Sequence, residues 1–253
     1  MVGDPSPNAI LQPDATLPAQ EFAMTDTPFA PPRGLHFLYV ADPLCSWCYG
    51  FQPVIERLAT HFAGRLPVRL VMGGLRAGNT KPMRDEDKAY IRSAWTNVSK
   101  ASGQSFDFSF FDRQGFIYDT EPACRAVVTA RDWGSDAPVS ALRFKAQISA
   151  AFYGHNRDVT DTDVIVAIAR EAGFDGEPFR TRFLSADVKS ATFRDFLTSQ
   201  ELGVTGFPML AAGSEAGGYA LVTNGFRPID GLIEALETWL AQGAPVMPAK
   251  AAQ

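Results

Sequence analysis

The feature that most constrains the fold of this chain is a cysteine pair, Cys45 and Cys48, placed between a strand-like and a helix-like segment. Residues 35–41 are almost wholly apolar and rich in β-forming side chains, as expected for a central strand covered on both faces. An Asp-Pro pair breaks this run, and residues 46–62 carry apolar side chains near a 3.6-residue spacing. The pattern therefore predicts a C-x-x-C pair at the N-terminus of a helix that follows a buried strand.

A second strand and a long helical block follow in the sequence. Residues 67–74 end in a glycine pair and predict a strand parallel to the first, in a right-handed βαβ unit. Pro53, inside the intervening helix, predicts a bend. The next block shows helical patterns at residues 85–102, 121–133, 138–153, 161–172, 177–185 and 189–201. N-cap oxygens are expected from Asp85, Thr120 and Asp161.

The last part of the chain returns to strands. Residues 209–212 and 219–223 predict a hairpin, and residues 228–240 predict an amphipathic helix. The order βαβ, helices, ββα predicts an α/β fold with a large all-helical insertion. We expect one α/β domain built from residues 34–75 and 203–243, with residues 76–202 as the helical insertion domain.

Both ends of the chain are predicted to lie outside the folded part. Residues 1–33 hold seven of the 18 prolines and show neither helical nor strand periodicity, so we expect a disordered tail. Met24 opens a short stretch just before the folded region and is a candidate for the true start of translation. Residues 244–253 are expected to form a flexible C-terminal tail.

Composition excludes several classes of partner. The net charge is −5, and no cluster of Lys and Arg offers an electrostatic footprint for nucleic acid or an anionic membrane surface. No segment approaches the ~20 apolar residues needed to span a bilayer. The N-terminal residues lack the basic and apolar regions of a secretory signal, which favours a cytoplasmic protein. Three cysteines in a chain of this length do not form a disulfide framework.

The cysteine pair is suited to redox chemistry. Residues three apart on a helix lie about 5 to 6 Å apart at Cβ, close enough for a disulfide after modest adjustment. The unpaired N–H groups at a helix N-terminus favour a thiolate. We therefore expect Cys45, at the helix end, to attack a disulfide, and Cys48 to resolve the mixed disulfide. Trp47 would shield one side of the sulfurs and offer apolar surface to a substrate.

A zinc site is the main alternative for the cysteine pair. Paired cysteines at this spacing are common zinc ligands, and two more ligands would have to come from Cys124 and one of His36, His61 and His155. None of these side chains is paired at ligand spacing, so we expect neither a metal nor another cofactor. Cys124 is expected to be buried as a small apolar side chain, with a third redox thiol as the alternative.

The segment from Asp42 to Gly50, Asp-Pro-Leu-Cys-Ser-Trp-Cys-Tyr-Gly, resembles the signature of DsbA-like oxidoreductases of the FrnE-related branch. Residues 203–208, Gly-Val-Thr-Gly-Phe-Pro, and 119–124, Asp-Thr-Glu-Pro-Ala-Cys, extend the resemblance. It implies a thioredoxin fold with a helical insertion and a cis peptide bond at Pro208, opposite the dithiol. The backbone of Phe207 would then pair with an extended substrate strand. This chain has Ser46 where many members of the family carry proline. The difference affects the expected redox potential of the dithiol and not the expected reaction.

Three functions are compatible with these residues. The first is thiol-disulfide exchange with protein substrates, and a reducing cytosol favours reductase or isomerase work. The second is a glutathione-dependent transferase or isomerase of the kappa or chromene-carboxylate type, although those proteins usually carry serine where Cys45 stands. The third is a non-enzymatic adaptor that presents protein clients to a protease. For Asp42, helix capping or loop solvation is the expected role, with loop orientation and proton transfer as alternatives.

Overall fold

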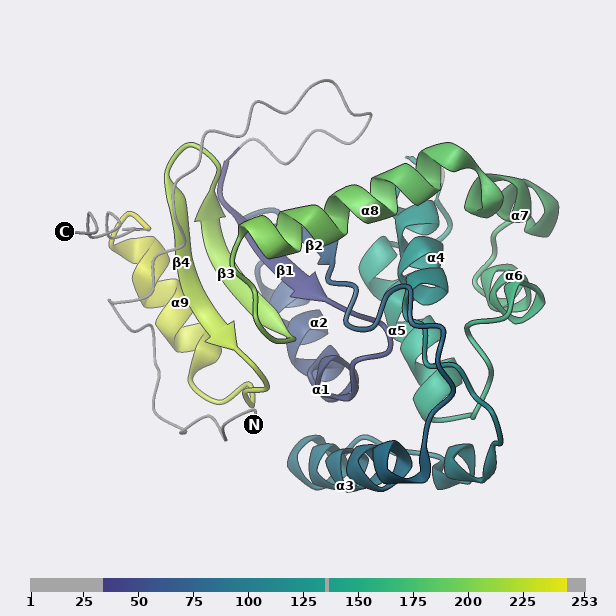
Figure 1. Ribbon diagram of the computed structural model, residues 1–253. Coiled ribbons are helices and arrows are strands. Elements are labelled where there is room, and N and C mark those ends of the chain that lie inside the picture. The colour runs from purple at the N-terminus through teal and green to yellow at the C-terminus, as the bar shows by residue number, and fades with distance from the viewer. Residues whose placement is uncertain (1–33, 135–136, 245–253) are drawn as a thin grey trace.

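The computed structural model describes residues 34–134 and 137–244, so the predicted tails lie almost entirely outside the described part. The elements in chain order are β1 (His36–Ala41), α1 (Ser46–Gly50), α2 (Gln52–His61), β2 (Val68–Met72), α3 (Asp85–Ser102), the 3₁₀ helix η1 (Phe108–Asp112), α4 (Glu121–Arg131), α5 (Ala141–Tyr153), α6 (Thr162–Glu171), α7 (Gly176–Leu184), α8 (Ala186–Glu201), β3 (Met209–Ser214), β4 (Gly218–Asn224) and α9 (Leu232–Ala241). The predicted fold class, an α/β thioredoxin fold with a helical insertion, is confirmed (Figure 1).

The four strands form one mixed sheet in the order β2-β1-β3-β4. β1 is parallel to β2 and antiparallel to β3, and β3 pairs with β4 as an antiparallel hairpin. The central strand β1 thus lies between the two halves of the fold, with Tyr39 opposite Leu70 on one side and Leu210 on the other. Because β1 ends immediately before the redox loop, the sheet fixes where Cys45 and Cys48 lie.

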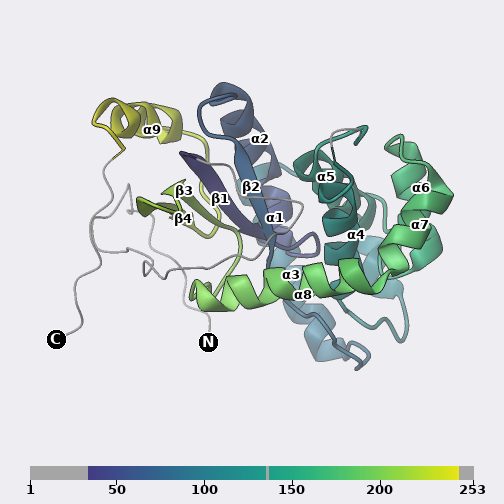
Figure 2. The same ribbon diagram turned by 90° about the horizontal axis from the view of Figure 1, so that it is seen from above.

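Both faces of the sheet are covered, which explains the unbroken apolar pattern of β1. Alternate side chains, including Phe37 and Tyr39, join a large core with α1, α2 and α9, whereas Leu38 and Val40 belong to a smaller core on the other face. Figure 2 shows α2 and α9 on one side of the sheet and α8 crossing the opposite side. The molecule is therefore layered as helices, sheet and helix.

The helical insertion packs against the redox end of the sheet (Figure 1). α4 is buried along eight consecutive residues, 123–130, because it contacts α5, α7 and α8. α3 crosses close to α1 at Gly50, where an added Cβ would lie 2.7 Å from Val98. Gly50 therefore allows the short helix that carries the cysteines to approach the insertion. Whether the insertion behaves as a separate domain stays a prediction.

Three details of the sequence prediction need correction. The predicted helix 46–62 is not one bent helix but two, α1 and α2, separated at Phe51, and Pro53 lies in the first turn of α2, where its missing N–H costs no helical hydrogen bond. The last helix begins at Leu232 and not at residue 228, because Gly231 has a φ of 73° and interrupts the helical path. Two caps also differ. Arg84, and not Asp85, occupies the N-cap of α3, and Thr120 occupies that of α4 but its side chain makes no capping hydrogen bond.

Candidate active site

The attacking thiol predicted from the sequence occupies the N-cap of α1. Cys45 Sγ accepts a hydrogen bond from the backbone N–H of Cys48, with a donor-to-acceptor distance of 3.4 Å. It also donates to the carbonyl oxygen of Phe207 at 3.6 Å. Cys45 is 6% exposed, whereas Cys48 and Cys124 are fully buried. Among the three cysteines, which are all free thiols, Cys45 is therefore the one with surface available to a disulfide.

The loop before β3 completes this site. The Phe207–Pro208 peptide bond is cis, as the resemblance implied. The contact between Cys45 Sγ and the Phe207 carbonyl joins two segments 162 residues apart in the sequence. Trp47, partly buried, packs its ring 5.6 Å from that of Phe226, centroid to centroid, in the loop after β4. The loop that carries the cis-proline therefore lies against Cys45. Phe226, which packs on Trp47, had no sequence signal.

The electrostatics of the two cysteines differ because Cys48 is buried. Burial raises the pKa of the Cys48 thiol well above its ordinary value, and the hydrogen bond with Cys45 and the charge of Cys45 act in the same direction. The positive charge of Lys145 and the backbone of Asp42 oppose this shift in pKa. Cys48 is therefore a thiol that requires help to ionise.

Asp42 is neither a helix cap nor a solvated loop residue. Its carboxylate is fully buried and accepts the backbone N–H of Leu44 at 2.8 Å and of Leu75 at 2.7 Å. The Cys124 thiol donates to the same carboxylate at 3.4 Å. Burial raises the pKa of Asp42, and these hydrogen bonds oppose that rise. Asp42 thus orients the redox loop, and Cys124 is buried as expected but with a polar contact.

The insertion helix α5 supplies three site residues that the sequence analysis missed. Lys145 Nζ donates to the Cys48 carbonyl at 3.0 Å, and Ser149 Oγ donates to the Pro43 carbonyl at 2.8 Å. Tyr153, one further turn along, stacks on Tyr49 with ring centroids 5.0 Å apart. The i, i+4, i+8 spacing that puts these side chains on one helix face was a readable signal. Nothing local, however, indicated that this face meets the redox loop.

The zinc alternative requires two ligands beyond the cysteine pair. Within residues 34–134 and 137–244, no group of three or more His, Cys, Asp or Glu side chains is arranged to hold a metal ion. His36 instead hydrogen-bonds the hydroxyl of Tyr219 at 2.7 Å, and His61 pairs with Glu237 at 2.8 Å.

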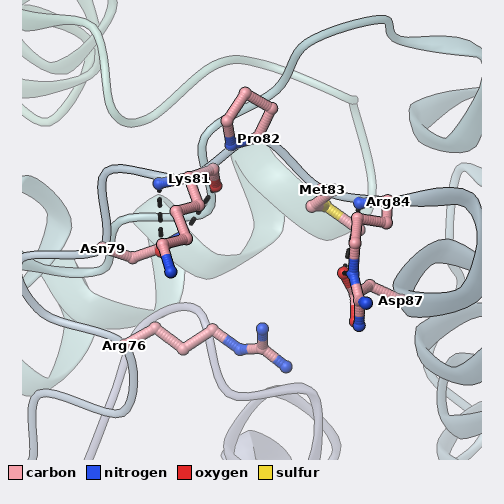
Figure 3. Close-up of a pocket in the computed structure, with 7 residues that line it drawn as sticks. All are labelled: Arg76, Asn79, Lys81, Pro82, Met83, Arg84 and Asp87. Carbon is pink, nitrogen blue, oxygen red and sulfur yellow. Dashed lines mark hydrogen bonds and ion pairs between the residues drawn. The ribbon is translucent and has the colours of Figure 1, made fainter.

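A cavity of about 400 Å³ lies beside the start of the insertion (Figure 3). Its lining comprises Arg76, Asn79, Lys81, Pro82, Met83, Arg84 and Asp87. Arg84 is paired with Asp87 at 3.0 Å across one wall. None of these residues belongs to the dithiol or cis-proline loops, but the guanidinium of Arg76 lies over the Tyr118 ring, whose hydroxyl donates to the Leu44 carbonyl at 2.7 Å. The cavity is therefore linked through Tyr118 to the loop that precedes Cys45.

Gly73 is required for Phe207 to lie beside Cys45. A Cβ at position 73 would overlap the Phe207 ring, and the backbone of Gly73 has no positive φ that would itself oppose alanine. Overpacking of this kind costs about 1–3 kcal/mol. We expect Gly73→Ala to displace Phe207 from Cys45 and to lower the rate of insulin disulfide reduction by roughly tenfold to a hundredfold, because misplacement by about 1 Å at a reacting site can cost ~10²-fold in rate.

The matched control for this prediction is Gly206→Ala, which adds the same methyl group next to Phe207 but in open space. It should keep the rate close to that of the wild type. The double variant Gly73→Ala, Phe207→Ala should be no slower than Phe207→Ala alone, because the overlapping ring is gone. Equal rates for Gly73→Ala and the wild type would contradict this account of the loop.

The chain is similar in sequence to a curated bacterial protein. The chain is 24% identical over 181 residues to the ClpXP adapter protein SpxH of Bacillus subtilis (strain 168), a match that covers 71% of this chain and 58% of that protein. The chain therefore spans less than two thirds of the length of this curated relative. No helix among the described residues is long and apolar enough to cross a membrane.

Solved structures are similar over more of their length. A structure from Nitrosomonas europaea, provisionally described as a protein disulfide isomerase, is 36% identical with a TM-score of 0.75, covering 83% of this chain and 99% of that one. The cytosolic disulfide reductase DsbM from Pseudomonas aeruginosa is 26% identical with a TM-score of 0.67, covering 82% and 99%, and has also been solved with GSH. The family model described as the DSBA-like thioredoxin domain matches residues 38–237. This chain is therefore a member of the DSBA-like thioredoxin domain family.

Proposed function

We propose that this protein is a thiol-disulfide oxidoreductase that exchanges disulfides with protein substrates through Cys45 and Cys48. The observation that carries the proposal is the position of Cys45 Sγ, held between the Cys48 N–H and the Phe207 carbonyl beside a cis-proline. This arrangement supports a nucleophilic sulfur next to backbone that an extended substrate strand can pair with. Ser46 and Trp47 lie between the two cysteines at the partly exposed edge of the site.

The reaction proceeds in two exchange steps. Cys45 loses its proton and its thiolate attacks one sulfur of a substrate disulfide, which forms a mixed disulfide; the other substrate sulfur leaves as a thiolate and takes up a proton. Cys48 then loses its proton and attacks Cys45 Sγ, which breaks the bond to the substrate and releases the second substrate thiol. Two electrons and two protons pass from the dithiol to the substrate disulfide, and Cys45 and Cys48 become a disulfide. The reverse sequence oxidises a substrate dithiol.

We propose the reducing direction and a cytoplasmic location. This chain matches almost the whole length of DsbM, which is described as a cytosolic disulfide reductase. That similarity supports both the direction and the location. A reducing compartment holds a dithiol of ordinary potential mainly in its thiol form. A redox titration coupled to insulin reduction and to refolding of scrambled ribonuclease separates reductase, oxidant and isomerase activities.

Trapping with a resolving-thiol variant tests the exchange mechanism. With insulin as the disulfide substrate, Cys48→Ala should accumulate a covalent mixed disulfide between Cys45 and an insulin chain, because the second step is removed while the first remains. The adduct should be visible by mass spectrometry and should disappear with dithiothreitol. Cys124→Ser is the matched control, since it removes an equally buried thiol and should form no trapped adduct. Absence of an adduct from Cys48→Ala would contradict protein disulfide exchange.

A non-enzymatic adaptor is the second candidate, because the curated relative named above is an adapter protein. In that case the folded surface would present a client to a protease, and the dithiol would at most sense oxidation. A double variant, Cys45→Ser with Cys48→Ser, distinguishes the two. An adaptor retains client binding and delivery in this variant, whereas a disulfide-exchange enzyme loses all turnover.

Glutathione is a candidate partner because DsbM has been solved with it. We propose it as the reductant that regenerates the dithiol rather than as the substrate of a transferase. Regeneration requires a thiol at position 45, whereas the kappa-type alternative relies on serine there. Saturable glutathione binding without thiol exchange, measured by calorimetry on the reduced protein, would favour the transferase alternative.

A further inference from the structure

Lys145 is a fully buried lysine directed at the redox helix from the insertion. Its ammonium donates to the Cys48 carbonyl at 3.0 Å and to Gln52 Oε1 at 3.0 Å. Burial of an ammonium is costly unless the charge is paired and hydrogen-bonded. α5 packs against α1, so the position of this charge is fixed by the docking of the insertion onto the redox loop (Figure 1).

The two hydrogen-bond acceptors of the ammonium, a backbone carbonyl and an amide oxygen, are both uncharged. The charges that act on Lys145 are, largest first, those of Cys48, Cys45, Asp42 and Glu56. Asp42 is occupied by the backbone N–H groups of Leu44 and Leu75. Glu56 accepts from Gln52 Nε2 at 2.9 Å. The remaining acidic groups around Lys145 are the two cysteines themselves.

The pKa directions agree with this pairing. Burial lowers the pKa of Lys145, and the neighbouring Cys48, Cys45, Asp42 and Glu56, in that order, oppose the fall. In return, the charge of Lys145 opposes the rise in the pKa of Cys48 that burial causes. Tyr39, on β1, also faces the cysteines, and burial followed by their negative charge raises the pKa of its hydroxyl. Lys145, which is hydrogen-bonded to the Cys48 backbone, is thus a buried cation whose charge favours ionisation of the Cys48 thiol.

We propose that Lys145 is a positioning residue for the resolving step, whose buried ammonium stabilises the thiolate that forms on Cys48 as it attacks the mixed disulfide. This inference rests on the proposed function. In this step Cys48 loses its proton, its sulfur bonds to Cys45 Sγ, and the bond from Cys45 to the substrate sulfur breaks. The proton that Cys48 loses passes to solvent and the released substrate thiolate takes up one from solvent, so the charge and electrons balance without another reagent. Lys145 keeps its own protons throughout.

A two-phase reaction with dithiobis(nitrobenzoate) isolates this step. Attack by Cys45 releases one nitrothiobenzoate, and resolution by Cys48 releases the second, so stopped-flow absorbance follows the steps separately. Lys145→Met retains much of the side-chain length without the charge. We expect the second phase to be slowed by roughly tenfold at neutral pH and its pH profile to move to higher pH, since a tenfold change corresponds to one pKa unit. Lys145→Arg should keep the wild-type profile.

Ser149→Ala is the matched control, because Ser149 lies one turn along the same helix and also holds the redox loop, but without a charge. It should leave the pH dependence of the second phase unchanged. A second phase in folded Lys145→Met with the wild-type pH profile would overturn the inference, as would a Lys145→Arg profile that coincides with that of Lys145→Met. If wild-type protein shows no second phase at all, the proposed exchange function fails instead.

A measurement on wild-type protein covers the case in which Lys145→Met does not fold. The lysine Cε signals of the reduced and oxidised forms can be followed by NMR across a pH series, with Lys145 assigned through Lys145→Arg. In the oxidised form no thiolate can face the ammonium, so Lys145 should deprotonate at lower pH than in the reduced form. Identical titration of Lys145 in both forms would overturn the inference.

Discussion

Replacing Cys45 with serine is expected to lower the rate of insulin disulfide reduction by about three orders of magnitude or more. The physical reason is that a thiolate, and not a neutral hydroxyl, is the nucleophile in disulfide exchange. The exchange of sulfur for oxygen is otherwise small, and the N-cap contact with the Cys48 N–H can be kept by a serine hydroxyl. The variant should therefore fold like the wild type while losing turnover.

The control variant for Cys45→Ser is Cys48→Ser. That variant keeps the attacking thiol, so it should still consume one equivalent of disulfide per protein but should not turn over. A pre-steady-state measurement with a chromogenic disulfide distinguishes the two variants. Cys48→Ser should release one equivalent of the coloured thiol per protein, whereas Cys45→Ser should release none through attack at position 45. Substantial steady-state turnover by Cys45→Ser would show that Cys45 is not the attacking sulfur.

The local parts of the site could be predicted from the sequence because they depend on neighbouring residues. The strand that precedes Cys45 is apolar throughout because both faces of the sheet are covered. α3 has the predicted bounds, 85–102, since an acidic first turn begins it and Gly103, with a φ of 76°, ends it. Asp161 caps α6 as expected by accepting the N–H groups of Asp163 and Val164. Propensity and capping chemistry decide such features within a few residues.

The surroundings of the dithiol could not be predicted because they depend on contacts between distant segments. Asp42 appeared to be a loop or cap residue, but the N–H of Leu75, 33 positions later, reaches its carboxylate after the chain has passed through β2. Lys145 is 97 positions from Cys48, and a lysine on a helix is ordinarily solvent-exposed. Its burial follows from the way α5 docks onto α1, a tertiary contact that no local pattern encodes.

Loss of the aromatic packing around Trp95 is expected to cause a large fall in folding stability. Trp95, on α3, is fully buried, and its ring centroid lies 4.8 Å from Phe111, 5.0 Å from Phe110 and 5.0 Å from Tyr153. We expect Trp95→Ala to lower the free energy of unfolding by about 3–5 kcal/mol, the cost of deleting a large buried aromatic side chain. The expected fall in Tm is roughly 6–20 °C, at about 2–4 °C for each kcal/mol.

Two further variants separate packing from other causes. Trp95→Phe should lose much less stability, because Trp95 Nε1 has no hydrogen-bond acceptor among the described residues and its removal relieves a buried unpaired donor. Tyr90→Ala lies on the same helix but is 67% exposed, so its change should remain within about 0.5 kcal/mol. Urea denaturation with linear extrapolation measures all three variants. A loss below about 1 kcal/mol for Trp95→Ala would contradict the packing argument.

The same cluster reaches the redox loop, which makes the stability prediction informative about function. Tyr153 contacts Trp95 and also stacks on Tyr49, the residue that follows Cys48. Because α3 and α5 hold α1 from two sides, loosening the cluster should also free the helix that carries the cysteines. Trp95→Ala should therefore slow exchange at temperatures well below its own unfolding transition. An unchanged rate under those conditions would mean that α5 alone, through Lys145 and Ser149, fixes the loop.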